Sequence, residues 1–467
     1  SMDNLELNGA VIDGKQASSS KDSYNNEGYF ARVQYDYANK LFFSASYRRD
    51  ASSRFHPDHR WGNFWSFGAG WLINEEPWFN AGWVDMLKVK ASIGSQGNDN
   101  ISNYLYTDTY TIANSNDEIA VTFRQKGNET ITWETNTNIN AGVDFSFWGG
   151  RLSGTAEYFY RLTSDMLFFF ATPVSVGYSG YYDNIGDMRN SGVEVSLNAG
   201  IIRSKDLNWD VYANLTHYKN KIIMLPDDRK TRTIEGHSGY ANLNKFIAEG
   251  LPLNTFLMQK YAGVEATTGL PMWYKDELDA EGNVIGRTTT TRYSEATEYL
   301  CEDPTPDLYG GFGTSLQFHG FDVAVALTYS IGGLTYDSGY ASYMDVPGGS
   351  VGGNFHKDVL KAWTPENPNT DVPRWQYNDT DITATSDRFL TDASYLNFQN
   401  AQVGYTFPEH LTRKFHVSRL RLYVSCDNIV YWSKRQGLDP RYSFDGSTNA
   451  NMNSPIRTLS GGINITF

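Results

Sequence analysis

The last nine residues, Leu459-Ser460-Gly461-Gly462-Ile463-Asn464-Ile465-Thr466-Phe467, alternate between apolar side chains and small or polar ones. Successive side chains of a β-strand point to opposite faces, so a period of two gives the strand two different faces. This segment therefore predicts a strand with one apolar face and one polar face, ending on the aromatic Phe467.

The same alternation recurs along the whole chain. The clearest further cases are residues 87–93, 193–199, 322–330 and 420–425. Counting alternating segments from about residue 29 gives about fifteen strands. The sequence thus predicts an all-β, antiparallel fold. Alternation alone leaves open whether the apolar face meets lipid or a protein core.

The connections between these segments separate into two kinds. Tight ones occur at Asn39-Lys40, Trp148-Gly149-Gly150, Lys205-Asp206 and His319-Gly320, and long ones at 163–188, 265–305 and 331–394. Short turns at one end and long loops at the other are typical of an up-and-down transmembrane barrel with periplasmic turns and extracellular loops. This layout places the polar segment 1–28 on the extracellular side and the barrel portion at 29–467.

The composition agrees with such a barrel. The 467 residues include 31 Tyr, 26 Phe and 12 Trp, yet the mean hydropathy is only −0.49. No stretch has the roughly 18 consecutive apolar residues of a spanning helix. The net charge of −14 and the lack of a basic run with interleaved aromatics argue against nucleic acid as a partner.

Several motifs, in their order and spacing, resemble the barrel half of the SusC/RagA family of TonB-dependent transporters of Bacteroidetes. They include 26–32, 35–40, 48–55, 61–66, 87–94, 133–134, 140–144, 160–167, 190–194, 304–307, 394–397, 427–428 and 437–440, followed by the terminal Phe467. The resemblance covers residues 27–467.

This resemblance implies a barrel of about 22 strands closed by an N-terminal plug domain. It also implies a multi-pass location in the Gram-negative outer membrane, where Phe467 would act as an assembly signal. The expected function is import of oligosaccharides or peptides, driven by the TonB complex and aided by a SusD-like surface lipoprotein. The plug, the TonB box and about seven early strands find no counterpart in the chain, so we expect it to be the C-terminal portion of the barrel.

Catalysis is not expected. The carboxylates Asp144, Glu157, Glu194 and Asp322 fall on polar strand faces, where paired carboxylates could in principle hydrolyse a glycan. Ion pairs with Lys88, Lys90 and Arg421 in a polar lumen explain them more simply.

No cofactor is expected either. His56 and His59 lack a third ligand at zinc spacing, and Cys301 and Cys426 are too few for a disulfide framework. The clusters 98–100 and 378–381 could bind calcium, but they lack the Gly and the distal Glu of an EF-hand, and turn chemistry is the simpler explanation.

Aromatic and polar residues in the long loops are the candidate substrate-binding groups, because exposed rings stack on sugars or grip peptide side chains. They are Trp273, Tyr274, Tyr340, Tyr343, Trp363, Arg374, Trp375 and Tyr377. Packing within the loops or at the membrane interface is the alternative role.

Two other classes of protein share some of these features. A passive porin or adhesin barrel would need neither plug nor lipoprotein, and a soluble carbohydrate-binding β-domain would lack aromatic girdles at lipid height.

Overall fold

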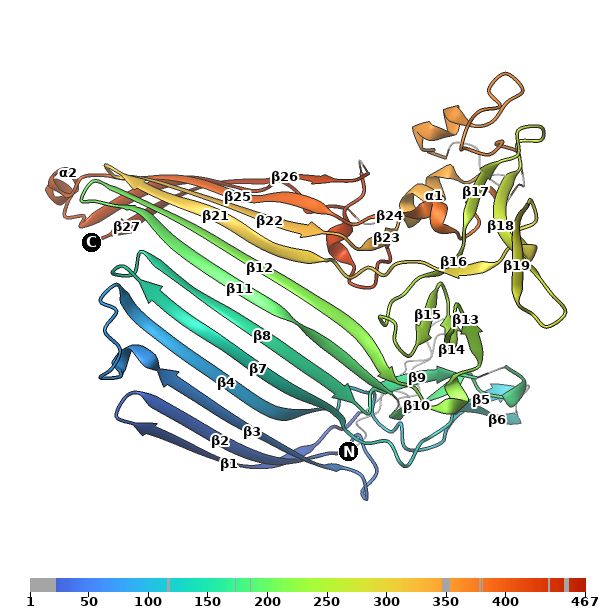
Figure 1. Cartoon of the computed structure of the whole chain (residues 1–467), viewed down its shortest axis with the longest axis horizontal. Coiled ribbons are helices and arrows are strands. Elements are labelled where there is room, and N and C mark those ends of the chain that lie inside the picture. The colour runs from blue at the N-terminus through green and yellow to red at the C-terminus, as the bar shows by residue number, and fades with distance from the viewer. Residues whose placement is uncertain are drawn as a thin grey trace.

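A computed structural model shows one long, curved antiparallel sheet with a group of loops at one end (Figure 1). It describes residues 22–115, 118–172, 174–184, 186–346, 353–377, 379, 381–435, 437–448 and 453–467. The sheet has thirteen strands, and their order across the sheet follows the sequence. They are β1 Asn26–Tyr37, β2 Leu41–Ser52, β3 Trp61–Leu72, β4 Val84–Asn98, β7 Glu134–Phe147, β8 Leu152–Ser164, β11 Asp187–Arg203, β12 Leu207–Met224, β21 Leu308–Phe318, β22 Phe321–Ile331, β25 Tyr395–Thr406, β26 Arg419–Ser433 and β27 Thr458–Thr466.

The connections separate as the sequence predicts. One end of the sheet carries the short links 38–40, 73–83, 148–151, 204–206, 319–320 and 407–418, which include the helix α2 Glu409–Thr412. The other end carries 53–60, 99–133, 165–186, 225–307, 332–394 and 434–457. β1 starts at the loop end and β27 finishes at the turn end, where Figure 1 marks the C-terminus. The predicted up-and-down order is confirmed; residues 1–21 of the segment 1–28 lie outside the described residues.

The predicted count of about fifteen strands was too high, since the sheet has thirteen. Short hairpins inside the loops share the period of two, and periodicity does not say to which sheet a strand belongs. The loop elements are β5 Thr109–Ser115, β6 Glu118–Gln125, β9 Leu167–Ala171, β10 Gly180–Asn184, β13 Arg232–Ile234, β14 His237–Asn242, β15 Lys245–Ala248, β16 Leu257–Gln259, β17 Tyr261–Val264, β18 Pro271–Leu278, β19 Val284–Thr290, β20 Glu298–Leu300, β23 Leu334–Tyr336, α1 Ser338–Met344 and β24 Leu390–Asp392.

The outer face of the sheet is apolar and uncovered. Val323, Val403 and Val424 lie side by side across β22, β25 and β26, and the last two are 50% and 54% exposed. Bulky apolar side chains repeat in this way over neighbouring strands with no protein layer above them. An apolar face of this kind suits lipid rather than water.

The inner face is polar and carries part of the predicted set of ion pairs: Lys90 and Arg421 are paired, whereas among the described residues Lys88 and Glu194 form no ion pair. Lys90 Nζ lies 2.9 Å from Asp144 Oδ1 and 3.2 Å from Glu157 Oε2. Arg421 Nε lies 2.8 Å from Asp322 Oδ1. These three carboxylates are engaged by cations on the adjacent strand or on the next strand but one, as expected for the wall of a polar lumen.

Aromatic residues gather at both ends of the outer face. Trp71, Trp78, Trp83 and Trp148 are exposed at the turn end, and the rings of Trp83 and Trp148 stack at 5.6 Å. Tyr29 and Trp61 stack at 6.3 Å near the loop end. Aromatic girdles at both interfaces are typical of transmembrane barrels. No helix in the described part of the chain is long and apolar enough to cross a membrane.

The sheet is open along two strands. All twelve residues of β1 are exposed, and among the described residues β1 and β27 form the two ends of the strand order rather than pairing with each other. Each unpaired backbone group in hydrocarbon costs several kcal/mol, so a stable barrel requires both edges to be paired.

Candidate ligand-binding surfaces

The described residues of three connections at the loop end pack into one unit, which we call the loop body; they lie within 225–307, 332–394 and 434–448 (Figure 1). Hydrogen bonds join the three parts. Tyr261 Oη donates to Asp371 O at 2.9 Å, Trp363 Nε1 donates to Ala266 O at 3.1 Å, and Tyr336 N donates to Gly446 O at 2.7 Å. Its interior contains fully buried apolar side chains, namely Phe256, Met258, Trp273, Met344, Ile382 and Phe389.

Trp273 therefore does not present the exposed ring that was expected of it. It lies on β18 with 1% exposure, and its ring meets Tyr293 edge-on at 5.2 Å. Its neighbour Tyr274 points the other way and is 37% exposed, with the Arg287 guanidinium 5.8 Å from its ring. Alternation along β18 separates the two rings, so Tyr274 alone of this pair is open to a ligand.

Three other candidates help to hold the loop body together. Tyr340, on α1, lies under the Arg435 guanidinium at 4.1 Å and donates its hydroxyl to Asp358 at 3.2 Å, while burial raises the pKa of Tyr340. Trp363 packs flat against Gly269, where a Cβ would lie 2.4 Å from the ring. Arg374 donates to Thr268 O at 3.3 Å.

Tyr343, Trp375 and Tyr377 are exposed, by 43%, 39% and 63%. The ring of Trp375 meets Phe355 at 5.1 Å, and Phe355 is itself 41% exposed. Sequence reasoning missed Phe355, although it follows a Gly-rich stretch of the kind found in exposed loops. We call Tyr343, Phe355, Trp375 and Tyr377 the exposed loop aromatics; Asn378, a polar neighbour, lies outside the described residues.

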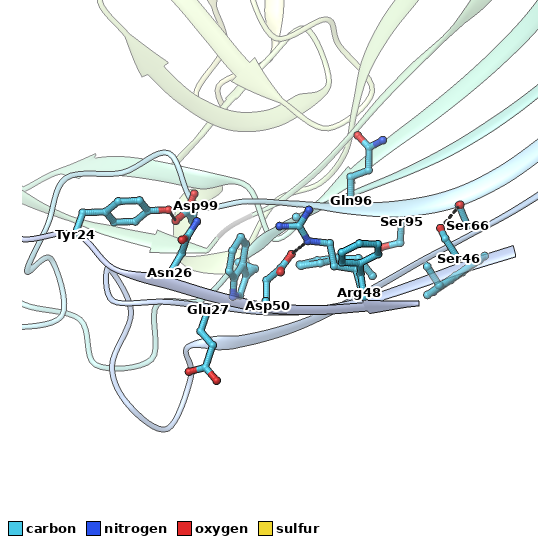
Figure 2. Close-up of a pocket in the computed structure, with 16 residues that line it drawn as sticks. Tyr24, Asn26, Glu27, Ser46, Arg48, Asp50, Ser66, Ser95, Gln96 and Asp99 are labelled. Carbon is cyan, nitrogen blue, oxygen red and sulfur yellow. Dashed lines mark hydrogen bonds and ion pairs between the residues drawn. The ribbon is translucent and has the colours of Figure 1, made fainter. Parts of the chain in front are cut away.

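A second surface, which sequence reasoning did not single out, is an open pocket of about 760 Å³ near the loop ends of β1 to β4, lined by both polar and aromatic side chains (Figure 2). We call it the wall pocket. Arg48 Nε donates to Asp50 Oδ2 at 2.5 Å, and the hydroxyls of Ser46 and Ser66 lie 2.6 Å apart. Strand register places Phe30 and Phe64 on either side of Arg48, on the inner face of the sheet.

The cluster 98–100, considered above as a possible calcium site, uses its side-chain oxygens in hydrogen bonds within the protein. Asp99 Oδ2 accepts hydrogen bonds from the hydroxyls of Tyr24 and Ser52, at 3.0 and 2.6 Å. Asn98 Oδ1 accepts from Asn100 N at 3.0 Å, which is turn chemistry. Within the described residues, no three His, Cys, Asp or Glu side chains are grouped to hold a metal ion.

The two cysteines are free thiols. Burial raises the pKa of Cys301 to about 11, so this thiol stays protonated and unreactive at neutral pH. Neither cysteine contributes to a candidate site.

The surroundings of Lys245 predict that the stability of the loop body depends on pH. Its ammonium donates to Asp445 O at 2.6 Å and to Asn254 O at 3.1 Å, and it lies 3.1 Å from the centre of the Phe256 ring. Burial lowers the pKa of Lys245 to about 8, although Asp445 and Asp303 attract its charge. An unfolded lysine has a pKa of about 10.4.

Folding therefore disfavours the lysine cation. This cost is fully present below pH 8 and shrinks as the pH rises toward 10, so the loop body should become more stable over that interval. We expect the midpoint of thermal unfolding to rise from pH 7.5 to 9.5, and Lys245→Met to flatten that rise. Equal slopes in both proteins would assign the effect to other groups.

Comparison with known proteins supports the interpretation of the sheet as part of a barrel. Residues 3–429 match the family described as TonB-dependent receptor-like, β-barrel. TonB-dependent receptor P3 of Formosa agariphila is 29% identical over 98% of the chain and 47% of its own length. SusC of Bacteroides thetaiotaomicron is 29% identical over 94% of the chain and 43% of its own length.

A solved structure agrees in three dimensions. The RagAB peptide transporter superposes with a TM-score of 0.83 at 27% identity, over 95% of this chain and 48% of that one. The chain thus spans about half the length of the relatives it matches. An outer-membrane barrel of the SusC/RagA type is confirmed, the soluble β-domain is ruled out, and the related proteins are transporters rather than enzymes. On the fold, the motifs and these matches together, the chain belongs to the TonB-dependent receptor β-barrel family, in its SusC/RagA branch.

Proposed function

We propose that the protein imports oligosaccharides or peptides across the outer membrane, as part of a SusC-like, TonB-dependent transporter that works with a SusD-like surface lipoprotein. The observation that carries this proposal is the arrangement of the two ends of the sheet. A packed loop body lies at one end of a sheet whose inner face is polar, while the connections at the other end are short (Figure 1).

The loops suit capture of a ligand rather than its chemical conversion. The exposed loop aromatics offer flat rings on the extracellular side, and the lumen carboxylates Asp144, Glu157 and Asp322 are held in ion pairs. Rings of this kind stack on sugars and also grip apolar peptide side chains. This supports both ligand classes, and the RagAB peptide transporter is one relative with a stated ligand.

The unpaired edges of the sheet and the family of the chain suggest which partners the barrel would need. Strands that pair with β1 and β27, together with a plug, would close and gate the barrel, and the plug region would contact the TonB complex. Loops of this length provide a large surface at which a SusD-like lipoprotein would bind.

Uptake by cells tests the proposal against a passive porin. Cells that carry the full receptor should accumulate a fluorescently labelled oligosaccharide or peptide ligand, and uptake should stop when an uncoupler removes the proton gradient. The receptor purified in mild detergent should bring a surface lipoprotein with it. Uptake that continues in uncoupled cells, at the same rate, would favour the passive porin or adhesin.

A further inference from the structure

Three cations lie close together near the loop end of β11 and β12, in the middle of the sheet (Figure 1). Arg189 on β11 is directly across from Lys221 on β12, and Lys219 lies two residues before Lys221 on the same strand. Both lysines are exposed. Side chains two apart on a strand share a face, so the three positive charges are neighbours on one surface. We call Arg189, Lys219 and Lys221 the outer cations.

The register places the outer cations on the lipid-facing side of the sheet. Val211 on β12 and Val325 on β22 flank Thr314, so Val211 faces outward with the valines of β22. Ala199 on β11 is directly across from Val211. The outer cations lie at even steps from these two residues, and the register between them is continuous. Since side chains at even steps share a face, all three point outward.

The cluster lies at the extracellular edge of the apolar band. Val193, on the same face of β11, is 40% exposed, and Tyr158, directly across from it on β8, is 47% exposed. β12 ends at Met224, where the loop body begins. Tyrosines gather at membrane interfaces, and the long loops of such barrels are extracellular. The outer cations therefore lie at the level of the lipid headgroups of the outer leaflet.

Carboxylates within the described residues leave these charges unpaired. None of the three side chains forms an ion pair or a hydrogen bond with them, and the Nε atom of Arg189 is buried without a partner. Asp187, the nearest acidic residue along β11, is separated from the arginine by a bulge. Glu249, beside the end of β12, is bound to Lys230 at 3.1 Å and to Leu225 N at 2.9 Å. Like charges directly opposite on adjacent strands repel, so the arrangement costs stability unless an anion from outside binds there.

We propose that the outer cations bind the phosphate group of a lipid in the outer leaflet. One guanidinium and two ammonium groups donate charge-assisted hydrogen bonds to phosphate oxygens, and a guanidinium can give two in parallel. The acyl chains of the same lipid would lie on the apolar face along Val193 and Leu197, which are 40% and 38% exposed. A lipid covers both surfaces, whereas free phosphate covers only the cations. The inference concerns the membrane around the barrel and is independent of the imported ligand.

Native mass spectrometry of the full receptor in a neutral detergent tests this site. The probes are bisphosphorylated lipid A, the same lipid after enzymatic removal of its phosphates, and inorganic phosphate as a competitor. Arg189→Gln and the double variant Lys219→Gln with Lys221→Gln remove the charges, while Lys219→Arg with Lys221→Arg keeps them. Lys88→Gln is the matched control, because Lys88 is an inner-face lysine with no ion pair among the described residues.

We expect the wild-type receptor to bind phosphorylated lipid A about tenfold more tightly than the lipid without phosphates. Arg189→Gln should weaken binding by about fivefold and the double glutamine variant by about thirtyfold, as one or two headgroup contacts are lost. The double arginine variant and Lys88→Gln should bind as the wild type does. Without lipid, the glutamine variants should unfold at or above the wild-type temperature, because the repulsion between the cations is relieved.

Several results would each overturn the site. They are equal affinity for the two forms of lipid A, wild-type affinity in the glutamine variants, and an equal loss in Lys88→Gln, which would point to net charge alone. Displacement of lipid A by an equimolar amount of inorganic phosphate would assign the cations to a free anion instead. All of these outcomes leave the import function untouched, because none of them measures uptake.

Discussion

Trp273→Ala should destabilise the loop body by about 3–5 kcal/mol, the usual cost of truncating a fully buried tryptophan. The side chain is 1% exposed and lies between β18 and Tyr293, so its removal leaves a cavity that the neighbouring rings cannot fill. Amide hydrogen exchange in β17 and β18 should accelerate by roughly two to four orders of magnitude.

Trp375→Ala is the matched control, because it removes the same side chain from the surface of the same loop body. Trp375 is 39% exposed, so its loss should change stability by about 0.5 kcal/mol or less. If the exposed loop aromatics contact the ligand, this variant should weaken binding without altering exchange. A Trp273→Ala protein with unchanged exchange would contradict the packing described for β18.

The sequence predicted the wall of the barrel better than its loops, and the reason is physical. Alternation with a period of two assigns each side chain of a strand to the lipid face or to the lumen face. Val323, Val403 and Val424, for example, lie side by side on the lipid face. The ion pairs of Lys90 and Arg421 followed from the same face assignment. The strand count failed because loop hairpins such as β18 and β19 share that period.

The binding residues were harder to predict for a different reason. Whether an aromatic residue in a long loop is a ligand contact or core depends on tertiary packing, which separates Trp273 from Tyr274 although they are adjacent. The wall pocket depends on three neighbouring strands placing Phe30, Arg48 and Phe64 in one row. No single segment carries that signal.

Val325→Arg should destabilise the barrel by about 2–4 kcal/mol, as for a charged side chain near the middle of the lipid-facing surface. Val325 lies near the centre of β22 and neighbours Ala401 on β25 in the same apolar face. The guanidinium would have to cross lipid to reach water or a partner. Equilibrium unfolding in urea, with the full barrel inserted in lipid vesicles, measures the effect.

Ala324→Arg tests the assignment of the faces with the same chemical change one residue away. Ala324 points to the inner face, where its strand neighbours are Ser315 and Gln402. A cation there meets polar groups and water, so the change in stability should be about 0.5 kcal/mol or less. If the two arginines cost the same, the two faces of β22 do not differ as lipid and lumen, and the barrel interpretation would lose its main support. A large cost at Val325 with little at Ala324 requires lipid on one side only.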